Sequence, residues 1–273
     1  MTVQTALLQG TRLLEDAGVA VPRLTAEVLL SHAIRRERVY LFAHPEQELK
    51  EVEWLHYGRY LHERMGGKPT QYITKKQEFY GREFRVTADV LIPRPETEHV
   101  IEVALRLARG ARRILDVGAG SGALAITLQL ETSAQTWGTD ISVRAAAVAE
   151  ENARRLGACV SLAVCDTMCA IASHSMDLIV SNPPYVPLSV ASGLQREVRD
   201  WEPREALFGG ESGFEIYEKI VADAPRVLRP EGWLIMELGF GGRDRVTDLL
   251  SSWKNVEIAP DLAGIPRVIA ARR

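Results

Sequence analysis

The sequence predicts an α/β protein with a mostly parallel sheet, preceded by a small helical domain, and three observations support this. From about residue 96, short apolar segments typical of buried strands alternate with longer segments of helical periodicity. A glycine-rich loop, Gly118–Gly122, follows the first of these strands. Before residue 68 the apolar spacing is helical throughout. Such alternation predicts parallel strands covered by helices on both faces.

The sequence before residue 95 predicts two smaller units. Helical spacing over residues 5–18, 25–34 and 51–65 predicts a bundle for a domain of residues 1–68. Apolar and polar residues then alternate, with Gly81 as a turn signal, which predicts a β-hairpin linker over residues 69–94. Pro93 and Pro95 end it, since proline cannot extend a strand ladder.

The third unit, residues 95–273, is predicted to hold the sheet. The last two strands are too close in sequence for a helical crossover, so we expect a hairpin and one antiparallel strand there. Helices are expected over residues 123–131, 142–157, 214–229 and 241–253, and strands over residues 112–118, 134–140, 160–166, 176–182, 232–238, 256–260 and 266–273.

Composition excludes several classes of protein. The 273 residues carry a net charge of −3, so no global field attracts nucleic acid or an acidic membrane. No long apolar run or signal-peptide core is present, and we expect a cytoplasmic protein. The three cysteines, Cys159, Cys165 and Cys169, form no disulfide framework, and no metal site is predicted.

The glycine loop predicts a nucleoside cofactor. Gly118, Gly120 and Gly122 permit tight turns before a helix N-terminus with free N–H groups. Asp140, about 20 residues later at the end of the next strand, is placed to accept the hydroxyls of a ribose. Asp166 ends the third strand, where it can accept from an adenine amino group, with Thr167 beside the base. The alternative reading is a tight turn that binds no ligand.

The loop, with Asp116 before it, resembles motif I of the S-adenosylmethionine-dependent methyltransferases, because its spacing is G-x-G-x-G and not the G-x-G-x-x-G of dinucleotide folds. The resemblance implies a Rossmann-like, seven-stranded class I methyltransferase fold. It also implies that Asp116 and the loop hold the methionine part of S-adenosyl-L-methionine. The expected cofactor-binding residues are Asp116, Gly118, Ala119, Gly120, Ser121, Gly122, Asp140, Ile141, Asp166, Thr167 and Asn182.

Asn182-Pro183-Pro184-Tyr185 ends the fourth strand and predicts the chemistry. In this superfamily N-P-P-Y marks enzymes that methylate a planar nitrogen, whose lone pair is delocalised. The Asn182 oxygen and the Pro183 carbonyl can accept the two N–H groups, and Tyr185 can pack on the plane. Asn182, Pro183 and Tyr185 are therefore the expected catalytic residues. A rigid turn without a catalytic role is the alternative.

The acceptor is indicated by further resemblance. The stretches 77–84, 91–98, 202–217 and 261–273 are similar to the glutamine methyltransferases of peptide chain release factors, and this similarity covers nearly the whole chain. It implies methyl transfer to the side-chain amide of the glutamine in the Gly-Gly-Gln motif of class 1 release factors. The expected substrate-binding residues are Asn182, Pro183, Pro184, Tyr185, Pro93, Arg94, Glu96 and Thr97.

Three alternatives stay open at this point. The chain could methylate a glutamine of a ribosomal protein, although the Pro93–Glu98 stretch favours the release-factor enzymes. It could methylate a nucleobase amine, but the N-terminal bundle lacks the basic character of a nucleic-acid recognition module. It could be a non-catalytic cofactor-binding scaffold, which the intact Asn182–Tyr185 motif argues against. We expect a monomer with no stable nucleic-acid binding and no membrane association.

Overall fold

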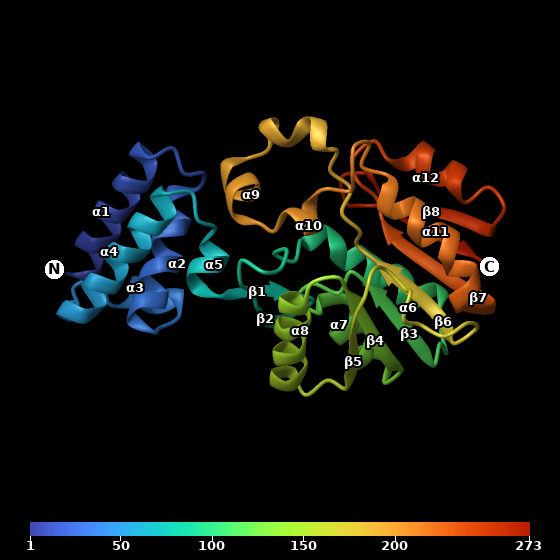
Figure 1. The fold of residues 1–273 in the computed structure, drawn as a ribbon. Helices are drawn as coiled ribbons and strands as arrows, with labels where there is room; N and C mark the ends of the chain where they lie inside the picture. Colours follow the sequence, from blue (N-terminus) through green and yellow to red (C-terminus); the bar gives the residue numbers. More distant parts are fainter. The chain divides into compact units, whose positions relative to one another are not determined.

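The computed structural model describes residues 1–273, which divide into two compact units. The first unit comprises Met1–Lys76 and Gln195–Trp201, and the second comprises Gln77–Leu194 and Glu202–Arg273. Figure 1 shows the mainly helical first unit and the sheet of the second.

The first unit is built on an apolar core from side chains at helical spacing, among them Leu14, Leu30 and Tyr57. The Gln195–Trp201 segment belongs to this unit, although it lies within the predicted 95–273 domain. An ion pair of 2.6 Å joins Arg64 Nη2 to Glu197 Oε2. The helices of this unit are α1 (Val3–Asp16), α2 (Pro22–Ile34), α3 (Arg38–Ala43), α4 (Glu51–Met65), α5 (Thr70–Thr74) and α9 (Arg196–Trp201).

A short hairpin begins at the end of the first unit. Its strands are β1 (Lys76–Phe79) and β2 (Arg82–Arg85), so it is shorter than the hairpin expected over residues 69–94. The preceding residues form α5 instead, where the adjacent Tyr72 and Ile73 are both buried. A strand would point two adjacent side chains to opposite faces, whereas one helical turn can bury both.

The second unit holds a seven-stranded sheet of order β5-β4-β3-β6-β7-β9-β8, which confirms the predicted fold class. Only β9 runs antiparallel to its two neighbours, β7 and β8, as the sequence predicted for the terminal hairpin. The strands are β3 (Arg113–Val117), β4 (Gln135–Asp140), β5 (Val160–Val164), β6 (Met176–Ser181), β7 (Leu228–Glu237), β8 (Lys254–Pro260) and β9 (Pro266–Arg272).

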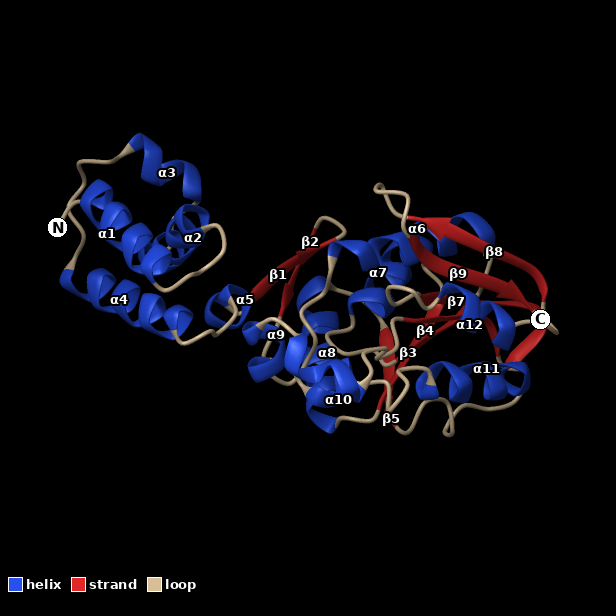
Figure 2. Cartoon of the chain, turned by 90° about the horizontal axis from the view of Figure 1, so that it is seen from above, coloured by secondary structure: helices blue, strands red, loops and turns tan.

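Helices cover both faces of this sheet (Figure 2). Ile114 and Ile235 pack on one face against α6, α7 and α8, and Leu115 and Met236 pack on the other against α11 and α12. The helices of this unit are η1 (Pro95–Thr97), α6 (Glu98–Leu107), α7 (Ala123–Thr132), α8 (Val143–Leu156), η2 (Leu188–Gly193), α10 (Arg204–Leu207), α11 (Glu215–Val227) and α12 (Arg243–Leu249).

The strand order locates the ligand crevice. Connections leave β3 towards β4 on one side, while β6 lies on its other side, so the order reverses between β3 and β6. Ligands of doubly wound sheets bind beyond the carboxyl ends of the strands at such a reversal. Val117 at the end of β3 is paired in register with Ser181 at the end of β6. The glycine loop and Asn182 therefore begin side by side.

Candidate active site

The glycine loop is held tightly at the end of β3. Gly118, Gly120 and Gly122 have φ angles of 77°, 54° and 82°, a region that glycine enters without steric cost. The Gly118 and Ala119 N–H groups donate to the Thr139 carbonyl at 2.8 and 2.9 Å. These bonds fix the loop to β4, so its position relative to the neighbouring strand end is set before any ligand binds.

Asp140 ties the loop to the next helix. Its Oδ2 accepts from the Gly120 N–H and its Oδ1 accepts from the Ser142 N–H, each at 2.8 Å. A carboxylate oxygen can accept more than one hydrogen bond, so both oxygens keep capacity for further donors. Because Asp140 also lines a cavity, its carboxylate is suited to a pair of ribose hydroxyls.

Asp116 is buried beside the loop with one oxygen lacking a partner. Its Oδ2 accepts from the Ala125 N–H at 3.1 Å, while Oδ1 has no hydrogen bond. Burial raises the pKa of Asp116 to about 7, against the opposing effect of the Ala125 bond. A buried, unpartnered carboxylate oxygen is costly unless a donor or cation completes it. Since Asp116 lines the cavity, a cationic ligand group is the fitting partner.

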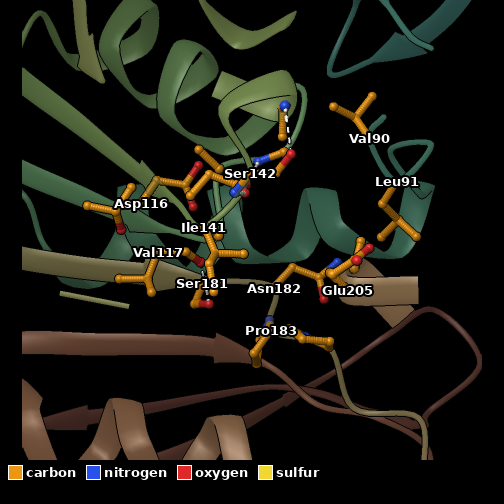
Figure 3. Close-up of a pocket in the computed structure, with 18 of the residues that line it drawn as sticks. Val90, Leu91, Asp116, Val117, Ile141, Ser142, Ser181, Asn182, Pro183 and Glu205 are labelled. Atoms are coloured by element: carbon orange, nitrogen blue, oxygen red, sulfur yellow. Dashed lines mark hydrogen bonds between the residues drawn. The ribbon is translucent and has the colours of Figure 1, made fainter. Parts of the chain in front are cut away.

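One cavity of about 340 Å³ connects these groups, within the size range of small-molecule sites. Figure 3 shows Asp116, Ile141 and Asn182 around it. The expected site residues that line it are Pro93, Thr97, Asp116, Gly118, Ala119, Gly120, Ser121, Asp140, Ile141, Asp166, Thr167, Asn182, Pro183 and Pro184. Four others, Gly122, Arg94, Glu96 and Tyr185, do not line it.

Each of three residues outside the lining has a different environment. Gly122 packs against α7, where a Cβ would come within 2.7 Å of Ile126 Cδ1. The Arg94 guanidinium pairs with the buried carboxylate of Glu202. Glu96 is exposed. None of these three residues forms part of the cavity wall.

Tyr185 lies behind the cavity. Its ring packs directly on Gly239, where a Cβ would come within 2.6 Å of Tyr185 Cδ2. Its hydroxyl donates to Glu237 Oε1 at 3.4 Å, and burial raises its pKa. Because Tyr185 itself does not line the cavity, its stacking on the planar acceptor stays a prediction.

Asn182 follows β6 and lines the cavity, and the nitrogen of its side-chain amide makes a hydrogen bond within the protein. Its Nδ2 donates to Thr97 Oγ1 at 3.0 Å, and Thr97 Oγ1 donates to Glu237 Oε2 at 2.5 Å. Glu237, at the end of β7, had no role in the sequence-based prediction. Its burial raises its pKa to about 7, against the lowering effect of Thr97 and Arg267.

The loop after α10 supports the turn that follows Asn182. The Val186 N–H donates to the Leu207 carbonyl at 2.9 Å, and the Gly209 N–H donates to the Val186 carbonyl at 3.1 Å. A Cβ on Gly209 would come within 2.4 Å of the Pro184 carbonyl oxygen. This glycine-rich loop therefore packs on the backbone of the N-P-P-Y turn.

Several lining residues were not predicted. Among them, Lys219 on α11 pairs with Asp166 at 2.8 Å, which places a cation beside the acid expected at the adenine. The other additions include Val90, Leu91, Ser142, Glu205, Phe208 and Ile216. Leu91 lies in the stretch 91–98, and Glu205, Phe208 and Ile216 lie in the stretch 202–217, so the resemblance already pointed to their segments. Val90 and Ser142 lie outside these stretches.

The structure contains no cluster of three or more His, Cys, Asp or Glu side chains that could hold a metal ion. None of its helices is long and apolar enough to cross a membrane. The three cysteines are free thiols.

Comparison with solved structures supports the fold. A methyltransferase from Pyrococcus furiosus is 16% identical, with a TM-score of 0.56 over 71% of this chain and 89% of that chain. A Thermus thermophilus 16S rRNA methyltransferase, solved with AdoMet and guanosine, is 19% identical, with a TM-score of 0.52 over 72% of this chain and 49% of that chain. At these identities the likeness extends to the fold alone.

Sequence comparison goes further. Residues 5–74 match the family model described as PrmC N-terminal domain, and residues 100–193 match the one described as Methyltransferase small domain. A release factor glutamine methyltransferase of Koribacter versatilis is 44% identical over 100% of this chain and 99% of its own length. One of Nitratidesulfovibrio vulgaris is 42% identical over 100% of this chain and 95% of its own length. The fold, the cavity and this full-length similarity together show that the chain belongs to the release factor glutamine methyltransferase family.

Proposed function

We propose that this chain transfers a methyl group from S-adenosyl-L-methionine to the side-chain amide nitrogen of the glutamine in the Gly-Gly-Gln motif of class 1 peptide chain release factors. One observation carries the proposal: Asn182 and Pro183 line the same cavity as the glycine loop and Asp116. A carrier of the methyl group and a planar amide would therefore meet in one crevice. Full-length relatives named for this activity support the choice of acceptor.

The residues present fit the cofactor. The unpartnered Asp116 Oδ1 suits a cationic group, and the remaining lone pairs of Asp140 suit a ribose. Apolar lining from Leu91, Ile141 and Ile216 suits the flat base. When bound, S-adenosyl-L-methionine supplies an electrophilic methyl group on a sulfonium sulfur.

The protein's task is to localise the nitrogen lone pair and to align it. In an amide this pair is delocalised towards the carbonyl. The Asn182 Oδ1 and the Pro183 carbonyl oxygen accept hydrogen bonds from the two N–H groups of the substrate amide. These hydrogen bonds direct the nitrogen lone pair towards the methyl carbon and stabilise the positive charge that grows on nitrogen. With S-adenosyl-L-methionine bound, its methyl group would pass to this nitrogen, the sulfur would keep the electron pair of the former carbon–sulfur bond, and the surplus proton of the nitrogen would leave to water. Alignment in a preformed cavity supplies much of the acceleration.

The remaining parts of the proposal concern the rest of the chain. In this proposal the N-terminal helices, residues 1–68, position the release factor. The match of residues 5–74 to the model described as PrmC N-terminal domain supports the presence of this domain. The protein acts in the cytoplasm, as a monomer, without stable nucleic-acid binding. A nucleobase acceptor is the weaker candidate, because the structural neighbours named for RNA substrates are similar in fold alone.

The test is methyl transfer from labelled S-adenosyl-L-methionine to a purified unmethylated release factor, with mass mapping of the product. A large-subunit ribosomal protein, bulk DNA and bulk RNA serve as competitors. We expect one methyl on the Gly-Gly-Gln glutamine. Label on RNA or DNA, with none on the release factor, would refute the proposed acceptor.

Asn182→Ala tests the assigned chemistry. We expect cofactor affinity to be retained and kcat to fall by about a hundredfold or more, as when a transition-state hydrogen bond is removed. Gln135→Ala is the matched control, since it removes an exposed amide at the amino end of β4. Unchanged turnover in Asn182→Ala would refute the role of this amide.

A further inference from the structure

Three polar side chains from separate elements are linked by hydrogen bonds in a series that ends at Asn182. Thr97 ends η1, directly before α6, while Glu237 ends β7 and Asn182 follows β6. Asn182 Nδ2 donates to Thr97 Oγ1 at 3.0 Å, and Thr97 Oγ1 donates to Glu237 Oε2 at 2.5 Å. Thr97 and Glu237 are only 4% and 1% exposed, so water does not compete for these bonds. The three side chains therefore hold one another in place, with Thr97 and Asn182 in the cavity wall.

The hydrogen bonds of this series have a direction. An ionised carboxylate can only accept, and a hydroxyl has a single proton to donate. When Glu237 is ionised, the Thr97 proton is committed to it, and Thr97 Oγ1 can only accept from Asn182. The amide must then present its NH₂ group to Thr97 and its Oδ1 to the cavity. A flipped amide would place Oδ1 against an oxygen with no free proton, leaving two acceptors face to face.

This direction depends on the charge of Glu237, and charged or titratable groups face it from four elements. Tyr185 donates to its Oε1 at 3.4 Å from the turn after β6, and Tyr217 on α11 donates to its backbone carbonyl at 2.7 Å. Arg267 on β9 favours the ionised form, and Glu96 on η1 opposes it. Burial is the largest influence and raises the Glu237 pKa to about 7. Protonated Glu237 could donate to Thr97, which would free the Thr97 proton for the opposite amide orientation.

We propose that Thr97 and Glu237 are positioning residues that hold the Asn182 amide with its oxygen towards the substrate nitrogen. The inference rests on the proposed function, in which Asn182 Oδ1 accepts an N–H of the substrate glutamine. With the amide flipped, an NH₂ group would face the NH₂ group of the glutamine, and the lone pair could not be directed. Thr97 and Glu237, which we call the relay, therefore affect turnover through Asn182 and do not touch the reacting atoms.

The test compares Thr97→Val with Thr97→Ser in release-factor methylation at saturating cofactor. Valine keeps the size and branching of the side chain but removes the hydroxyl, whereas serine keeps the hydroxyl. We expect kcat to fall about ten- to a hundredfold in Thr97→Val, the range for loss of one oriented hydrogen bond at the reacting group, and to recover in Thr97→Ser. Cofactor affinity by calorimetry should stay within about twofold of the wild type in both variants, because the relay orients only Asn182.

A pH profile tests Glu237 separately. We expect the wild-type kcat to rise as pH increases through about 7, where Glu237 ionises. In Glu237→Gln this rise should disappear and kcat should stay low, because an amide at this position can donate to Thr97. Saturating cofactor keeps the titration of Asp116 in the free enzyme out of this profile.

The outcomes separate the two proposals. A wild-type protein that does not methylate the release factor refutes the proposed function and the relay with it. A wild-type protein that does so, with wild-type kcat in Thr97→Val, refutes the relay alone. Equal losses in Thr97→Val and Thr97→Ser would also refute it, since packing and not the hydroxyl would then be responsible. If Glu237→Gln fails to fold, the comparison of Thr97→Val with Thr97→Ser still tests the proposal.

Discussion

Substitution of Asp116 by asparagine should weaken cofactor binding and remove its pH dependence. Asparagine keeps the size of the side chain and an oxygen that can accept from the Ala125 N–H, but it has no negative charge. Asp116 is fully buried and its Oδ1 lacks a partner, so a cationic cofactor gains its full attraction only when the carboxyl is ionised.

The magnitude follows from the pKa of about 7 that burial gives Asp116 in the cofactor-free protein. With that pKa, the ionised fraction increases about tenfold between about pH 6 and about pH 8, equivalent to about 1.4 kcal/mol of binding free energy. The affinity for the cofactor should therefore rise as pH increases through about 7, because the cationic cofactor binds the ionised form of Asp116 more tightly than the protonated form. In Asp116→Asn we expect a loss of about ten- to a hundredfold at the higher pH, as for a hydrogen bond to a charged group.

Isothermal titration calorimetry with S-adenosyl-L-methionine at several pH values measures both effects. Asp244→Asn is the matched control, since this carboxylate is 94% exposed and distant in sequence from the cavity-lining residues. A wild-type affinity that is flat across this range, or an Asp116→Asn variant that keeps the wild-type pH dependence, would show that Asp116 does not meet the cationic part of the cofactor.

Three further perturbations test other parts of the site. Asp140→Ala should weaken cofactor binding about ten- to a hundredfold by calorimetry, because its carboxylate also holds the glycine loop; normal affinity would exclude it from the site. Gly239→Ala should lower the free energy of unfolding by about 1–3 kcal/mol in urea and reduce kcat, because the new methyl group would overlap the Tyr185 ring; unchanged kcat would contradict the importance of that packing. The stability of the cofactor-free protein should fall as pH rises from about 4 to about 7, because burial raises the pKa of Asp116 and Glu237, so that the folded protein keeps protons there that the unfolded chain has already lost; Asp116→Asn should reduce this fall in urea titrations, and an identical slope would refute the linkage.

The sequence alone was sufficient for the sheet and for much of the cavity. Strand and helix periodicities are local, so the seven strands and their terminal hairpin could be predicted from spacing. Asp116, Asp140 and Asn182 could be placed together because each adjoins the carboxyl end of a parallel strand, and such ends share one edge.

Tertiary structure decided the orientation of side chains in the connecting segments. Two residues of the predicted site, Thr97 and Tyr185, both contact Glu237, yet only Thr97 lines the cavity. Gly239 permits Tyr185 to pack behind the wall, and no local pattern around the N-P-P-Y turn could indicate this. Thr97 and Glu237 are 140 residues apart, and their hydrogen bond forms only because α6 begins beside the end of β7. Periodicity determines which elements form, whereas contacts between distant segments depend on how those elements pack.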